Sequence, residues 1–112
     1  MTIDLYRNEK AMVKQKNKSF KKEDMIKMAE ILKAAAHPDR LAMLSLLYKS
    51  SEKCLSVKTI YEKLGMQQPI VSRHLKILKS AGIVSKLQEG RKMFYCLCTD
   101  KESITTLLCF FK

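Results

Sequence analysis

One predicted helix carries a face of hydrogen-bond donors that is free of acidic residues. The helix lies between Met66 and Gly82, and at about 100° per residue its side chains separate into two faces. The polar face carries Ser72, Arg73, Lys76 and Lys79. The apolar face carries Val71, Leu75 and Leu78, with His74 at its margin. A helix of this kind packs through its apolar face and offers donors suited to phosphates and base edges, although an ordinary solvated surface helix is the alternative.

Capping and turn residues on both sides of this helix predict a second helix before it and two strands after it. Before it, Ser56 suits the N-cap of a helix that ends at Gly65, where glycine suits a left-handed C-cap. Helix, glycine-containing turn, helix is the helix-turn-helix arrangement. After it, residues 83–88 and 92–98 predict two strands joined by the turn Glu89-Gly90-Arg91. We therefore expect a helix-turn-helix followed by a two-stranded wing.

Three further helices are predicted around this unit. One begins near Lys22, a second spans residues 38–48 and should be buried centrally, and the last runs from Asp100 with Thr99 and Glu102 as a capping box. The first helix has an apolar stripe of Met25, Met28, Ala29, Leu32 and Ala35, with Ile26 and Ile31 off it. The last helix has a stripe of Ile104, Leu107, Leu108 and Phe111. Because Ile26 and Ile31 lie off the stripe of the first helix, we expect a second covered surface there, against another subunit. Because so small a core leaves the stripe of the last helix without a partner, we expect a dimer interface on that helix.

The predicted elements define one domain with an extension. Residues 1–21 are polar and basic, and we expect them to form an arm, which either contacts DNA or is a solubilising tail. Residues 22–112 form the folded domain, close to the commonest domain size. The expected fold is mainly α with a small β-hairpin wing, in the order four helices, two strands, one helix (ααααββα).

Charge and composition narrow the function. The formal net charge of +11 on 112 residues points to a polyanionic partner, first nucleic acid and second an anionic membrane surface. No apolar run is long enough to span a bilayer, and the charged N-terminus lacks a signal peptide, so we expect a cytoplasmic protein with reduced cysteines. We find no phosphate loop, nucleophile elbow or paired carboxylates, so we expect neither an enzyme nor a cofactor.

Two stretches of the chain resemble the ArsR/SmtB family of bacterial winged-helix repressors. They are AAAHPDRLAMLSLL and YEKLGMQQPIVSRHLKILKSAGIVSKLQEGRKMFYCL, and the likeness runs from about Met25 to Phe111. The resemblance implies a homodimer, paired through the first and last helices, that binds palindromic double-stranded operator DNA. It is specific because a leucine-glycine pair, a basic recognition helix, an alanine-glycine pair and a glycine wing turn occur together in this order.

The resemblance also implies which residues contact DNA. By position, Gln68, Ser72 and Arg73 match the base-reading residues at the start of the recognition helix, where glutamine pairs with adenine and arginine with guanine. The phosphate contacts would come from Lys76, Lys79, Arg91 and Lys92. For His74, whose angle puts it near the core edge, we favour packing and hydrogen bonding.

The family's known sensor sites are missing from this chain. The positions of the metalloid-binding cysteines are Ser56 and Lys58, the last helix lacks the histidines of zinc sensors, and the helix position of the redox cysteine is Ser45. We therefore expect no metal site of these types. Three cysteines remain, Cys96, Cys98 and Cys109, which could bind a soft ion such as arsenic(III) or, as we favour, pack as small apolar side chains.

The resulting hypothesis is a dimeric transcriptional repressor released from its operator by an unidentified inducer, either a metalloid, a metal or a thiol-reactive species. The alternative is a nucleic-acid or nucleoid binder that has no sensor and little sequence preference. The ratio of operator affinity to random-DNA affinity separates the two, because specific regulators exceed about 10³.

Overall fold

The computed structural model describes residues 21–112, as five α-helices, one short 3-10 helix and three strands. The helices are α2 (Lys22–Ala35), α3 (Pro38–Lys49), α4 (Val57–Leu64), α5 (Gln68–Ser80) and α6 (Glu102–Leu108), followed by η1 (Cys109–Phe111). The strands are β1 (Cys54–Ser56), β2 (Val84–Glu89) and β3 (Lys92–Leu97). The predicted arm, residues 1–21, lies outside the described residues except for Lys21, which is the N-cap of α2.

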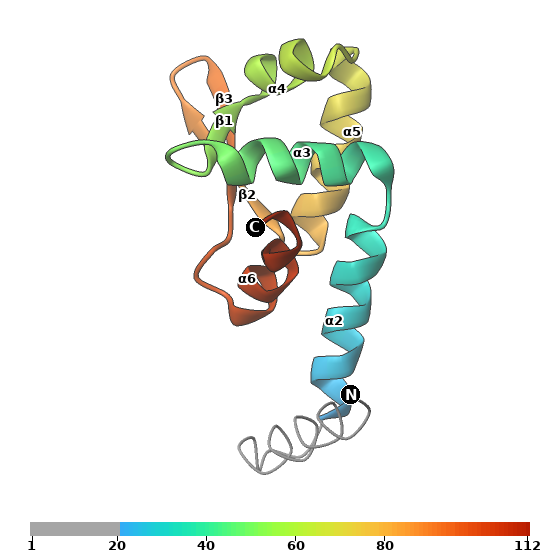
Figure 1. The fold of residues 1–112 in the computed structure, drawn as a ribbon. Helices are drawn as coiled ribbons and strands as arrows, with labels where there is room; N and C mark the ends of the chain where they lie inside the picture. The colour runs from blue at the N-terminus through green and yellow to red at the C-terminus, as the bar shows by residue number, and fades with distance from the viewer. Residues whose placement is uncertain (1–20) are drawn as a thin grey trace.

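The core lies where α3 crosses α5. In Figure 1, α3 runs across the middle of the molecule, α4 lies beyond it beside the sheet, and α6 and α2 lie on the other side. The side chains of Met43, Leu44 and Leu47 on α3 are fully buried, as are those of Val71, Leu75 and Leu78 on α5. The predictions that α3 is central and that α5 packs through this face are therefore confirmed.

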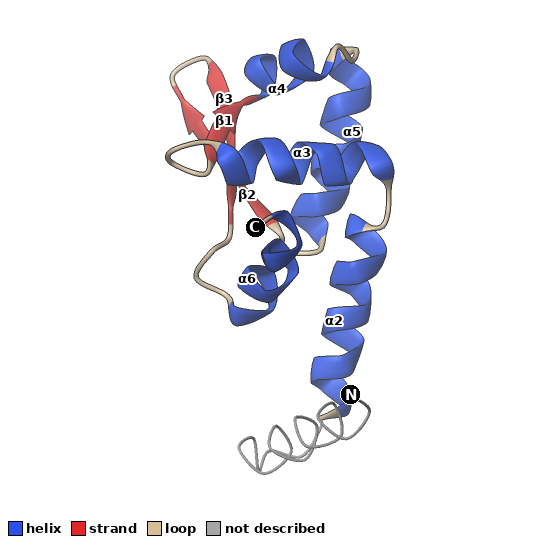
Figure 2. Cartoon of the chain, in the orientation of Figure 1, coloured by secondary structure: helices blue, strands red, loops and turns tan. Residues whose placement is uncertain are grey.

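The sheet has one strand more than the sequence predicted. β1 pairs with β3, and β3 pairs with β2, all antiparallel, so the order is β1-β3-β2 (Figure 2). β2 and β3 form the expected hairpin, with Gly90 at φ 61° in the turn. β1 is only three residues long, too short to show the alternation by which a strand is recognised in a sequence. The fold is nevertheless the expected one, mainly helical with a β-hairpin wing.

Two local predictions about the outer helices are wrong. Ile31, expected on a second surface away from the chain's own core, is buried in it, while Met25 and Leu32 of the predicted stripe are about half exposed. The capping box at Thr99 does not form, because α6 begins at Glu102 with Lys101 as its N-cap and has no side-chain cap. The rotation of α2 is set by its packing against α3 and α5 rather than by helical periodicity alone.

Candidate nucleic-acid interface

The helix-turn-helix is built by local capping at both of its helices. Ser56 Oγ accepts a hydrogen bond from the Thr59 backbone N–H (3.1 Å), which fixes the start of α4. Gly65 ends α4 at φ 62°, in the left-handed region that favours glycine. The Met66 N–H then donates to the Tyr61 carbonyl oxygen (3.0 Å), so the chain reverses tightly before α5. These bonds confirm the predicted caps of α4 and the turn.

The polar face of α5 is exposed as the sequence predicted. Of its predicted site residues, Gln68, Arg73, Lys76 and Lys79 are exposed and Ser72 is half-buried. Gln68 Nε2 donates to Ser72 Oγ (2.7 Å), which joins two of the predicted base-reading side chains to each other. Arg91 and Lys92 are exposed at the tip of the wing, where Arg91 lies in the β2–β3 turn and Lys92 begins β3.

A hollow of about 540 Å³ separates α5 from the wing. Its lining consists of Val57, Gln68, Ser72, Lys76, Lys79, Lys86, Met93 and Tyr95. None of these residues is acidic, and three are lysines. Burial raises the pKa of Tyr95, so its hydroxyl stays neutral beside the lysines. The hollow therefore concentrates positive charge between the polar face of α5 and the wing strands.

Two residues lie differently from what the sequence alone indicated. Lys86 on β2 faces this hollow but was missing from the predicted site, although it is an exposed basic residue on a predicted wing strand. Arg73, predicted beside Ser72, does not line the hollow and occupies another part of the exposed face of α5. The structure thus brings Gln68, Ser72, Lys76 and Lys79 together around one hollow and leaves Arg73 outside it.

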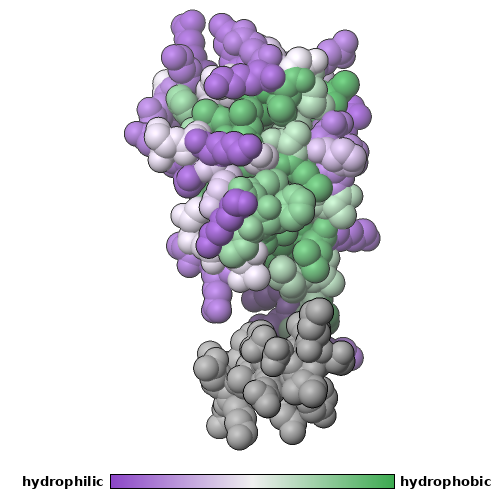
Figure 3. Space-filling model, in the orientation of Figure 1, coloured by the Kyte–Doolittle hydropathy of each residue, from purple (hydrophilic) through white to green (hydrophobic). Residues whose placement is uncertain are grey.

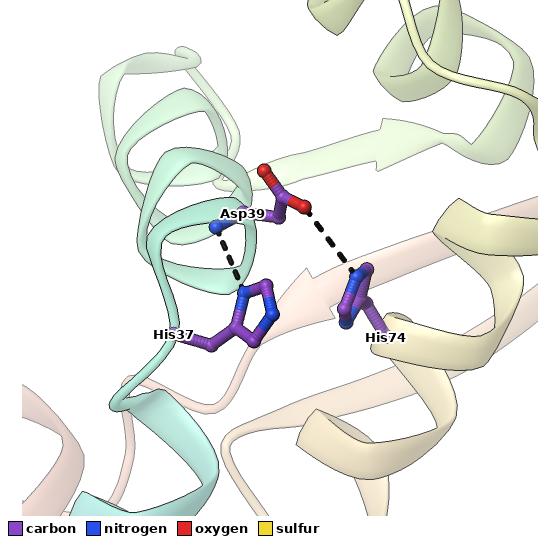
Figure 4. Close-up of side chains that lie close together, drawn as sticks. All are labelled: His37, Asp39 and His74. Carbon is purple, nitrogen blue, oxygen red and sulfur yellow. Dashed lines mark hydrogen bonds and ion pairs between the residues drawn. The ribbon is translucent and has the colours of Figure 1, made fainter.

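A cluster of polar side chains ties α5 to the start of α3. His37 Nδ1 accepts a hydrogen bond from the Asp39 backbone N–H (3.1 Å), and His74 Nε2 lies 3.7 Å from Asp39 Oδ2 (Figure 4). Arg40 Nη1 lies 3.3 Å from His74 Nδ1. Only 12% of the His74 side chain is exposed. These contacts agree with the packing and hydrogen-bonding role that the sequence favoured for His74.

Burial and positive neighbours keep His74 neutral. Desolvation lowers its pKa below 6.5, His37, Arg40 and Arg73 lower the pKa further, and Asp39 alone raises it. A neutral imidazole accepts a hydrogen bond through one nitrogen only. With Arg40 facing Nδ1, the ring proton lies on Nε2 and points toward Asp39.

His37, Asp39 and His74 are the one group within residues 21–112 whose ligating atoms, all within 4.8 Å of one another, could hold a metal ion. Metal binding needs a free lone pair on each imidazole. Nδ1 of each ring already faces an N–H donor, and the Arg40 guanidinium adds a positive charge beside His74. The cluster is therefore arranged as a hydrogen-bond network rather than as a metal centre.

The cysteines differ from the prediction that all four are free thiols. Cys54 and Cys96 form a disulfide between β1 and β3. Cys98 is free and half-buried, and Cys109 is free and exposed on η1. The structure therefore does not present Cys96, Cys98 and Cys109 as three thiolates. The sequence missed the pair because Cys54 was not assigned to any strand, so its register opposite Cys96 was unknown.

An apolar groove runs between α2 and the C-terminal helices. It has a volume of about 460 Å³ and is lined by Met28, Leu32, Ala35, Ala36, Leu41, Thr106, Leu107, Phe110 and Phe111. Figure 3 shows apolar side chains gathered on the face that α2 and α6 share. Phe110 is 77% exposed at the edge of the groove. So much apolar surface on one face is typical of a protein interface.

Comparison with known proteins identifies the family. A profile of the bacterial regulatory protein arsR family matches residues 37–86, which run from the start of α3 into β2. An HTH-type transcriptional regulator of Methanocaldococcus jannaschii is 44% identical over 75 residues, which cover 67% of this chain and 82% of that protein. This chain belongs to the ArsR family. The HTH-type transcriptional repressor SmtB of Mycobacterium tuberculosis is 43% identical over 68 residues, which cover 61% of this chain and about half (48%) of the repressor.

Solved structures of related regulators support the assignment of this chain to the ArsR family. The transcriptional repressor PagR of Bacillus anthracis superposes with a TM-score of 0.71 and 26% identity, over 82% of this chain and all of PagR. A homodimeric winged helix-turn-helix DNA-binding domain from Mycobacterium bovis gives a TM-score of 0.68 and 29% identity, over 83% of this chain and 82% of that domain. The predicted family and winged helix-turn-helix fold are confirmed. The protein is a transcriptional regulator, as its relatives are, and they are not enzymes.

Proposed function

We propose that this ArsR-family regulator is a dimeric, sequence-specific repressor that binds double-stranded operator DNA through α5 and the wing. The observation that carries the proposal is the hollow between α5 and β2, which is lined by three lysines and no acidic residue. A groove lined by one sign of charge attracts the opposite charge, and the net charge of +11 acts in the same direction.

Base recognition is proposed for Gln68, Ser72 and Arg73 near the start of α5. Because Gln68 donates to Ser72 in the free protein, binding exchanges that bond for bonds to a base edge. Arg73 is exposed and does not line the hollow, so its guanidinium is free to reach a guanine, a contact worth about 1–3 kcal/mol of discrimination.

Phosphate contacts are proposed for the lysines of the hollow and for the wing tip. These residues are Lys76, Lys79, Arg91 and Lys92, to which we add Lys86. They set the position of the protein on the duplex without reading its sequence. Residues 1–20 lie outside the described structure. For the basic arm to which they belong, both proposals stand, namely additional contacts to the DNA backbone and a solubilising tail.

Dimerisation is proposed through α2 and α6, the first and last helices of the folded domain. The apolar groove between these helices supports a second copy of the chain as its occupant, because two copies bury the same face against each other. A two-fold dimer presents two α5 helices, which explains why a palindromic operator is expected.

Release by an inducer completes the proposal. The inducer classes remain a metalloid, a metal or a thiol-reactive species. Of the candidate residues Cys96, Cys98 and Cys109, the structure has Cys98 and Cys109 as free thiols and Cys96 bonded to Cys54. No helix in residues 21–112 is long and apolar enough to cross a bilayer. We propose that the protein works in the cytoplasm, where its operator lies.

The test is fluorescence anisotropy with DNA from upstream of the protein's own gene and with random DNA of equal length. We expect an affinity ratio above about 10³. Four phosphate contacts in each protomer also give log affinity a salt slope of about −7 for the dimer, and the contact added by Lys86 makes it steeper. A ratio near one at every salt concentration would instead support the alternative, a nucleoid binder without sequence preference.

A further inference from the structure

Two cysteines lie directly opposite each other in the sheet. Cys54 begins β1 and pairs in register with Cys96 near the end of β3. Their sulfur atoms are bonded, while the ladder continues through the next two pairs, Leu55 with Tyr95 and Ser56 with Phe94. Because the ladder holds the two residues opposite each other, the sulfur atoms stay adjacent whether or not they are bonded.

The pair lies on the side of the sheet that does not face the core. Tyr95 and Leu97, which flank Cys96 along β3, are buried, so the side chain of Cys96 projects to the other face. On that face its neighbour across from β2 is Ser85, which is exposed. β1 is the outer strand of the sheet, and Cys54 and Cys96 are both half-buried rather than fully buried. A small reagent therefore reaches the pair without unfolding the core.

We propose that Cys54 and Cys96 form a reversible thiol–disulfide site whose partner is a low-molecular-weight disulfide of the glutathione class. In the closing direction, one protein thiolate attacks the small disulfide and releases one small thiol. The second protein thiolate then attacks the mixed disulfide and releases the other small thiol. The protein pair loses two electrons and two protons, and the small disulfide gains them as two thiols.

The bond encloses the helix-turn-helix and the wing. The covalent ring from Cys54 to Cys96 contains α4, α5, β2, the wing turn and nearly all of β3. Every residue that we propose for DNA contact on α5 and the wing, from Gln68 to Lys92, lies inside the ring, whereas the N-terminal arm lies outside it. The groove proposed for dimerisation lies outside it, on α2, α3 and the C-terminal helices. The redox state of the pair therefore acts on DNA binding and not on the dimer face.

Closing the ring restrains the wing relative to α5. β1 continues directly into α4, and β3 carries the wing, so a bond between the two strands joins the wing to the entrance of the helix-turn-helix. In the dithiol form the β1–β3 ladder and the packing of α4 on β3 make this connection without a covalent bond. A restrained unit loses less freedom on binding, so the disulfide form binds operator DNA several-fold more tightly. This last effect rests on the proposed function; the site itself does not.

The experiment compares the full chain in glutathione buffers from fully reduced to fully oxidised. Free thiols are alkylated and located by peptide mass spectrometry, and thermal unfolding is followed by circular dichroism. We expect Cys54 and Cys96 to lose alkylation together and the Tm to rise by roughly 10 °C, because the bond closes a loop with a sequence separation of 42. The control, Cys98→Ser with Cys109→Ser, keeps both changes.

The double variant Cys54→Ser with Cys96→Ser should unfold at the Tm of the reduced protein in every buffer. If it fails to fold, the reduced and oxidised wild-type forms still supply the comparison. Alkylation of both cysteines in the oxidised buffer, or a bond that stays closed in the reduced buffer, would overturn the proposal. Equal operator affinity of the two forms would overturn the link to DNA binding, and failure of both forms to prefer operator DNA would count against the proposed function instead.

Discussion

Arg73 and Lys79 project from the same helix but differ in their surroundings. Lys79 lines the hollow together with Lys76 and Lys86, where positive charge gathers. Arg73 lies outside the hollow, next to the His74 network, and contributes to lowering the pKa of His74. We therefore assign different roles to two residues of the same charge on one helix. Lys79 contacts phosphate whatever the sequence, and Arg73 recognises a base.

Substituting these two residues should separate affinity from specificity. We expect Lys79→Ala to weaken operator and random DNA about equally and to make the salt slope of the dimer shallower by about 2, because each protomer loses one phosphate contact. Arg73→Ala should weaken binding to operator DNA more than binding to random DNA. It should also relax the preference at one base pair of each half-site. Anisotropy titrations on single-base operator variants measure both effects. Equal losses on all DNA for Arg73→Ala would contradict its role as a base reader.

His74 makes stability depend on pH. Its pKa in the fold is below the 6.5 of the unfolded chain, so the unfolded state binds protons first as the pH falls. The contribution of the neutral imidazole is therefore complete above pH 6.5 and is lost as the pH falls toward the lower pKa of the fold. Urea unfolding between pH 7.5 and 5 should show a declining free energy of unfolding. His74→Gln, which cannot titrate, should show a smaller decline, and an unchanged decline would exclude His74 as its origin.

At the scale of elements, the geometry of the helix-turn-helix depends on how α4 ends. Gly65 has φ 62°, and a Cβ atom added there would have no neighbour within 4 Å. The requirement for glycine therefore comes from the backbone conformation and not from a lack of space. The direction in which the chain enters α5, and with it the orientation of Gln68, depends on this conformation.

Substitutions at Gly65 should measure the cost of that conformation alone. We expect Gly65→Ala to lower the free energy of unfolding by about 1 kcal/mol, because alanine disfavours the left-handed region. Gly65→Asn should lower it less, since asparagine tolerates this region better. Chemical denaturation with a single probe for both variants gives the comparison. A larger loss for asparagine than for alanine would show that side-chain size, and not backbone conformation, limits the position.

At the scale of the whole molecule, two surfaces are left for partners. One is the positively charged hollow between α5 and the wing, and the other is the apolar groove between α2 and the C-terminal helices. The core formed by α3 and α5 lies between them. With this arrangement, a dimer can form through the apolar groove while the positively charged hollows of both protomers bind the same DNA duplex.

A charge placed in the groove should dissociate the proposed dimer. Leu32 is 49% exposed and lines the groove, so Leu32→Lys would leave an unpaired charge between two apolar faces. We expect sedimentation velocity to show a monomer for this variant and a dimer for the wild type. Leu87→Lys, a similar substitution at an exposed leucine on the wing, should stay dimeric. A dimeric Leu32→Lys protein would move the interface to another face.

Residue types and spacing alone determined the helix-turn-helix, its wing and its polar face. Capping residues such as Ser56 and Gly65 act through bonds within a few positions, so their effect is visible in the sequence. The alternation in β3, with Tyr95 and Leu97 buried, is equally local. The family resemblance, which the comparisons confirm, rests on the same short-range pattern.

Only the tertiary structure decided which distant residues meet. The pairing of Cys54 with Cys96 needs the register of β1 on β3, and the place of Lys86 opposite the lysines of α5 needs the angle between wing and helix. The burial of Ile31 instead of Leu32 depends on how α2 rotates against its neighbours. Each of these is a contact between segments far apart in the chain, and its geometry is set by packing of the whole core, which no local pattern of residues records.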